Sequence, residues 1–106
     1  METPYTYLFI RKDLSNPQQI VQASHAALQA GNRFGEHSHL VLIGVESEDQ
    51  LYKAADHLEQ HQIEFEMFHE PDFDTGHTAI CTRPLAGSER RPLRRFQLMK
   101  AEDAVV

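Results

Sequence analysis

The chain has 106 residues and a formal net charge of −6, and 41% of its residues are hydrophobic. This length suits one domain over residues 1–106, with a core that needs no disulfide. No apolar run approaches the ~18 residues that cross a bilayer, and the first residues lack a signal-peptide pattern. Cys81 is the sole cysteine. We therefore expect a cytoplasmic protein with no membrane contact.

The charges are unevenly distributed. Residues 1–82 hold 4 Lys or Arg against 13 Asp or Glu, whereas residues 83–100 hold six Lys or Arg and one acid. An acidic body repels phosphate, but a local basic patch can still hold it. Arg94 and Arg95 are therefore candidate contacts to an RNA backbone. A plain solvated surface explains the same run of arginines.

The first half of the chain predicts a strand, a helix and a second strand. Residues 5–11 (YTYLFIR) are rich in aromatic and β-branched side chains, which indicates a buried strand. Ser15 and Gln18 have the spacing of a helix capping box. Residues 39–45 (HLVLIGV) form the next apolar strand. The expected buried stripe of the helix is Ile20, Ala23, Ala27 and Ala30.

The second half predicts another helix, a hairpin and a short tail. Ser47 and Gln50 repeat the capping pattern at the start of the second helix. The further expected elements are strands over residues 63–68 and 77–82, a short helix over 87–95 and an edge strand over 96–100.

This order predicts a three-layer α/β/α domain with a mixed, mostly parallel sheet of four or five strands. Sites in such sheets lie beyond the carboxyl ends of the parallel strands. Those ends are residues 11–13, 45–47 and 69–70. An exposed edge strand over 96–100 invites covering by a second copy, so we also consider a homodimer.

A family resemblance begins at one of these strand ends. Residues 10–30 (IRKDLSNPQQIVQASHAALQA) resemble the opening of type 2 peptidyl-tRNA hydrolases, which carry Arg-x-Asp-Leu and then Gln-x-Ser-His-Ala. Residues 77–87 (HTAICTRPLAG) resemble the final core strand of that family and the turn after it. The matching residues of the two opening motifs are Arg11, Asp13, Leu14, Gln22, Ser24, His25 and Ala26.

The resemblance implies hydrolysis of the ester between a peptide and tRNA. That reaction needs an oriented water, a stabilised oxyanion and bound phosphates. The implied catalytic residues are Asp13, His25 and Glu70. The implied substrate contacts are Arg11, Lys12 and Gln22, besides Arg94 and Arg95. No metal or other cofactor is implied.

Several family positions differ here. Tyr5 and Gln18 stand where the family has lysines, and EPDFD (residues 70–74) replaces an Asp-Ala-Gly-x-Thr loop, with Thr75 only a loose match. A second function therefore stays open: an inactive relative that binds a protein, a nucleotide or RNA. Each candidate also has a structural interpretation, with His25 bonded into the scaffold, Asp13 ordering a turn and Glu70 a plain loop acid.

The sequence contains two sets of histidines that are candidate metal ligands. His57 and His61 are four residues apart on a helix, and one ion can bridge such a pair. The second set surrounds the hairpin and consists of His69, Asp72, Asp74 and His77. The helix with His57 and His61 lacks the glutamate arrangement that accompanies such a pair in metalloproteases, and both histidines lie on its expected polar side. The hairpin set matches no metal-motif spacing, so we predict no metal site. Cys81 is predicted to be a small core residue.

Overall fold

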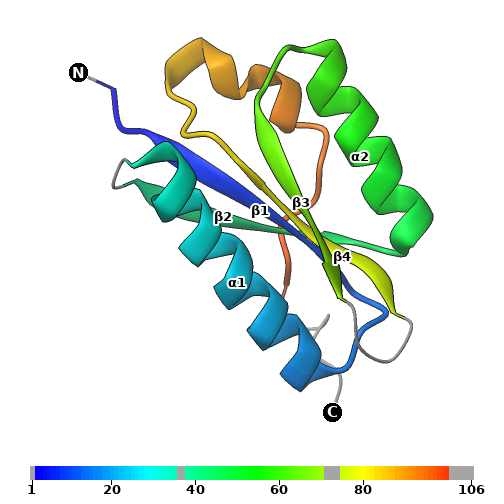
Figure 1. Cartoon of the computed structure of the whole chain (residues 1–106). Helices are drawn as coiled ribbons and strands as arrows, with labels where there is room; N and C mark the ends of the chain where they lie inside the picture. The colour runs from blue at the N-terminus through cyan, green and yellow to red at the C-terminus, as the bar shows by residue number, and fades with distance from the viewer. Residues whose placement is uncertain (1, 36–37, 71–74, 101–106) are drawn as a thin grey trace.

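The computed structural model describes residues 2–35, 38–70 and 75–100 (Figure 1). No helix in these three ranges is both long enough and apolar enough to span a membrane. The secondary-structure elements of the protein, in chain order, are β1 (Tyr5–Arg11), α1 (Asn16–Phe34), β2 (His39–Val45), α2 (Glu48–Gln60), β3 (Phe65–Glu70), β4 (Gly76–Thr82) and the short 3-10 helix η1 (Gly87–Leu93).

The four strands form one mixed sheet in the order β2-β1-β4-β3. Only β1 and β2 pair in parallel, and β4 is antiparallel to both of its neighbours. The prediction of a mixed four-stranded sheet is confirmed, but the prediction that it is mostly parallel is wrong. The reason is that β4 returns from β3 through a hairpin and lies between β3 and β1. A hairpin of this kind imposes antiparallel pairing on its strands.

The tail also differs from the expected elements. The helix expected over 87–95 is a 3-10 helix that ends at Leu93, with Pro92 inside its last turn. The fifth strand expected over 96–100 is only an isolated antiparallel bridge between Ile43 and Leu98. Beside it, the Met99 N–H donates to the Leu42 carbonyl at 2.9 Å. The tail therefore follows the outer edge of β2 without becoming a regular strand.

Helices cover both faces of the sheet (Figure 1). Successive residues of β1 point to opposite faces. Phe9 packs in an apolar cluster with Leu51 and Leu58 of α2, whereas Leu8 packs in a second cluster with Ala26 of α1. The predicted three layers are therefore present. Cys81 lies fully buried in the α1-side cluster, as predicted, and burial raises the pKa of its thiol to about 11.

The start of α1 follows the sequence pattern, and its buried stripe follows it in part. Ala30 is buried, and Ala23 and Ala27 pack against the α1-side cluster, as expected. Ser15 accepts from the Gln18 N–H, and the Gln18 side chain accepts from the Ser15 N–H, so the capping box is formed. Ile20, expected to be buried, is 67% exposed. The buried residues of α1 are Gln22, Ala26 and Ala30. The buried face extends to Gln22 and leaves out Ile20, because the Gln22 amide has polar partners on the sheet, described below.

The burial of Ala26 and the exposure of Ile20 generate a stability prediction. Ala26→Leu should lower the free energy of unfolding by about 1–3 kcal/mol, because a larger side chain must enter a packed helix–sheet interface. Ile20→Gln should change it by less than about 0.5 kcal/mol, as is usual at an exposed position. Urea unfolding of both variants measures the two values. A larger loss for Ile20→Gln would show that the helix packs on the stripe expected from the sequence.

Candidate functional site

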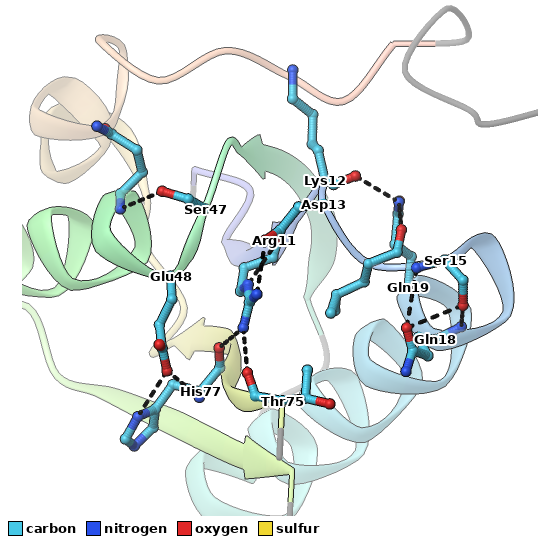
Figure 2. Close-up of polar contacts among 12 residues, drawn as sticks. Arg11, Lys12, Asp13, Ser15, Gln18, Gln19, Ser47, Glu48, Thr75 and His77 are labelled. Atoms are coloured by element: carbon cyan, nitrogen blue, oxygen red, sulfur yellow. Dashed lines mark hydrogen bonds and ion pairs between the residues drawn. The ribbon is translucent and has the colours of Figure 1, made fainter. Parts of the chain in front are cut away.

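One edge of the sheet gathers the polar side chains that the strand order brings together. β3 and β1 are both antiparallel to β4, so they run in the same direction as each other and as β2. The carboxyl ends of β1, β2 and β3 therefore share this edge with the start of β4. The first turns of α1 and α2 begin there as well (Figure 2). We call it the carboxyl edge.

Arg11 ties the end of β1 to the start of β4. Its Nε and Nη2 atoms donate to the two carboxylate oxygens of Asp13 at 2.9 and 2.8 Å. Its Nη1 donates to the carbonyls of Thr75 and His77 at 2.7 and 2.9 Å (Figure 2). Among the described residues, these bonds use four of the five guanidinium N–H groups. Arg11 is thus held rigidly, and the fifth N–H has no acceptor among residues 2–35, 38–70 and 75–100.

Asp13 is correspondingly held in its charged form. The hydrogen bonds from the Arg11 guanidinium lower the pKa of its carboxyl group, against an opposing effect of burial. The same contact raises the pKa of Arg11. A bidentate pair of this kind fixes orientation as well as charge.

Glu48, Tyr52 and His77 form a second hydrogen-bonded chain. Oε2 of Glu48 accepts from the backbone N–H of His77 at 2.7 Å and from the Tyr52 hydroxyl at 2.9 Å. The first of these contacts is the main cause of a lowered pKa for Glu48, so the carboxylate is ionised near neutral pH. The bond to Glu48 in turn raises the pKa of Tyr52.

The number of protons in the hydrogen-bonded chain of Glu48, Tyr52 and His77 decides which tautomer the imidazole adopts. Tyr52 has one hydroxyl proton and donates it to Glu48, so its oxygen accepts from Nδ1–H of His77, 2.8 Å away. The other ring nitrogen, Nε2, then carries the lone pair. Within the three described ranges, no residue forms a hydrogen bond with Nε2. This is the arrangement of a general base held in one tautomer.

Gly76 makes the contact between Glu48 and β4 possible. Its φ of +81° lies in the left-handed region, and a Cβ there would be 2.2 Å from Oε2 of Glu48. Any side chain at this position would displace the carboxylate and strain the backbone.

Gln22 connects α1 to the sheet beside this edge. It is 5% exposed. Its Nε2 donates to Oε2 of Glu70 at 2.9 Å, and its Oε1 accepts from the Thr78 hydroxyl at 2.7 Å. Both ends of the amide are thus bonded, which offsets the cost of burying it.

The remaining predicted site residues lie apart from these contacts. Lys12 pairs with Glu46 at 2.9 Å. His25 is exposed on α1 and lines a shallow hollow beside Phe68. Arg94 is exposed. Arg95 contacts His57 of α2, on the face of the sheet opposite α1. The structure therefore joins Arg11 with Asp13 and Gln22 with Glu70. In the described part of the chain, it gives His25 no polar contact with any of them.

Glu48 and Tyr52 are absent from the site residues predicted from the sequence, and His77 is there a candidate metal ligand only. The spacing of Glu48 and Tyr52 places them on one helix face and was a usable signal. Their meeting with His77 depends on the insertion of β4 into the sheet, which no local pattern indicates.

The structure describes one of the two candidate sets of metal ligands in full and the other only in part. Asp72 and Asp74 lie outside the described residues. In the ranges that the structure does describe, no group of three or more His, Cys, Asp or Glu side chains is arranged to hold a metal. The rings of His57 and His61 lie 4.5 Å apart, and Nε2 of His57 bonds to the Pro92 carbonyl at 2.8 Å.

Comparison with known proteins identifies the fold alone. No family model and no curated protein matches the sequence. A solved structure, of a protein of unknown function from Agrobacterium tumefaciens, superposes with a TM-score of 0.71 at 10% identity. The match covers 94% of this chain and 100% of the other. The two proteins therefore share an α/β architecture.

The lowered pKa of Asp13 predicts a pH-dependent contribution to stability. A carboxyl group with a lowered folded-state pKa stabilises the fold above its ordinary pKa, and this contribution is lost as pH falls through the folded value. Asp13→Asn should therefore be less stable than the natural protein at pH 7, with a difference that shrinks below pH ~4.

Urea unfolding at pH 7, 5 and 3 measures that difference. Asp56→Asn is the matched control, because Asp56 is an exposed acid of α2. Equal behaviour of the two variants across the pH range would contradict a stabilising Arg11–Asp13 pair.

Proposed function

We propose that this protein is an ester hydrolase of the peptidyl-tRNA hydrolase type, with the carboxyl edge as its active centre. The observation that carries the proposal is the Glu48–Tyr52–His77 chain, which leaves a lone pair on Nε2 of His77. The Arg11 guanidinium lies near this chain and donates to the backbone carbonyl of His77. The peptidyl-tRNA substrate is proposed from the resemblance of residues 10–30 to that family.

In the proposed reaction, Nε2 of His77 removes a proton from a water molecule as the water oxygen attacks the ester carbonyl. The bond to the leaving alcohol oxygen then breaks, and the imidazolium returns the proton to that oxygen. Glu48, acting through Tyr52, holds the tautomer and stabilises the transient imidazolium, as a carboxylate does in a catalytic triad. The remaining N–H of Arg11 is the proposed donor to the oxyanion.

In this proposal the general base is His77, whereas the resemblance implies His25. His25 is exposed on α1, whereas His77 is held by two partners at the strand ends. In the proposal, Asp13 positions Arg11, and Glu70 acts with Gln22 to hold α1 against the hairpin. The catalytic role that the resemblance implies for His25 is not part of this proposal.

The proposal predicts that purified protein releases peptide from peptidyl-tRNA. His77→Gln should slow this release by about 10²–10⁴-fold, the usual contribution of a general base. His25→Gln is the matched control and should change it less than about threefold, because a surface substitution seldom perturbs a distant site. The measurement is the rate of peptide release by folded samples of the natural protein and of both variants. No release above background, or a greater loss in His25→Gln, would overturn the proposal.

A second candidate function is a binding module without hydrolytic activity. The observation that favours it is that Arg11 and Gln22, two residues of the family motif, are occupied by bonds within the protein. In that case the motif maintains the fold, and the partner is RNA, a nucleotide or another protein. A second copy of this chain, the homodimer considered above, would be one such protein partner.

Salt dependence tests this second candidate. An RNA held through its phosphates should bind at 50 mM salt and lose about 10³-fold in affinity by 200 mM if some six phosphates are contacted. Titration with labelled tRNA at both concentrations measures this loss. No binding at 50 mM would exclude RNA and leave a protein or small molecule as the partner.

A further inference from the structure

A separate cavity lies on the flank of α2 that faces β2 and the tail. Its volume is about 260 Å³. Val45, Ala54 and Phe96 supply its apolar surface, and Lys53, His57 and Arg95 supply its basic groups. Glu48 and Tyr52 extend from the other flank of the same helix toward His77. The cavity therefore lies at the β2 end of the carboxyl edge, apart from the Glu48–Tyr52–His77 chain.

The basic groups of this cavity have no acidic partner in the described part of the chain. Neither Lys53 nor Arg95 forms an ion pair with a described residue. Glu46, the acid at the rim, is paired with Lys12. Two positive charges thus face one small hollow in a chain whose net charge is −6. An anion inside the cavity is attracted by both of these positive charges.

Arg95 is also held in position. Nε2 of His57 lies 2.8 Å from the Pro92 carbonyl, which can only accept, so this nitrogen carries the proton. The opposite nitrogen, Nδ1, then accepts from Nη1 of Arg95 at 3.2 Å. This bond orients the guanidinium without neutralising its charge. A group oriented before binding loses less conformational entropy when a ligand arrives.

We infer that this cavity binds the terminal phosphate of a small phosphate monoester. A phosphate monoester carries close to two negative charges at pH 7, which matches Lys53 and Arg95. The volume is below the ~300 Å³ at which pockets for whole drug-sized ligands begin, so the phosphate and little else enters. The apolar surface at Phe96 receives the first carbon atoms of the ligand. This inference does not rest on the proposed hydrolase function.

Solution NMR with adenosine monophosphate tests the inference on the full chain. Adenosine monophosphate and inorganic phosphate should each shift the backbone amides of Lys53 and Arg95 and the imidazole of His57, whereas adenosine should not. Lys53→Gln and Arg95→Gln should each weaken the binding about tenfold, the loss expected for one charge-assisted hydrogen bond. Arg94→Gln, which removes the neighbouring exposed arginine outside the cavity, should leave the affinity unchanged.

Three results would overturn the inference. The first is an absence of shifts with millimolar adenosine monophosphate. The second is an equal loss of affinity in Arg94→Gln, which would mean that diffuse surface charge attracts the anion. The third is tighter binding of an oligonucleotide with a 5′-hydroxyl at the same resonances, which would indicate a phosphodiester groove. Urea unfolding shows that each variant is folded, and peptide release is measured separately, so the hydrolase proposal stands or fails independently.

Discussion

The contacts of Arg11 are the constraint on which the rest of the carboxyl edge depends. One guanidinium holds Asp13 on the loop after β1 and two carbonyls at the start of β4. This connection places His77 beside α2, where Glu48 receives its backbone N–H. A lysine could supply the charge but not the fixed fork of donors that such a junction needs.

Local patterns in the sequence predicted most of the elements, since both helix starts carry capping residues and β1 and β2 are apolar runs. The mostly parallel sheet was wrongly predicted because β4 pairs with β1 in antiparallel fashion, through contacts between residues about seventy positions apart. On α1, Ile20 was wrongly expected in the core for a related reason. Periodicity ranks Ile20 above Gln22 as a core residue, and only the presence of Glu70 and Thr78 makes burial of an amide favourable.

Helix α2 separates two kinds of chemistry. On one flank, ionised Glu48 and Tyr52 orient an imidazole; on the other, Lys53 and Arg95 face a cavity of about 260 Å³. Adjacent positions on a helix, such as Tyr52 and Lys53, point about 100° apart. A single helix thereby serves two neighbouring surfaces, and its buried leucines fix both against the same sheet.

Gly76 has a consequence for recognising distant relatives. The Glu48 carboxylate occupies the space that a side chain at position 76 would need. A relative that keeps the imidazole chain must therefore keep three features together: an acid in the first turn of the second helix, a tyrosine four residues later, and a glycine directly before the histidine. Their joint presence is a sequence signature of the contact, which remains readable where overall identity has fallen to the level of chance.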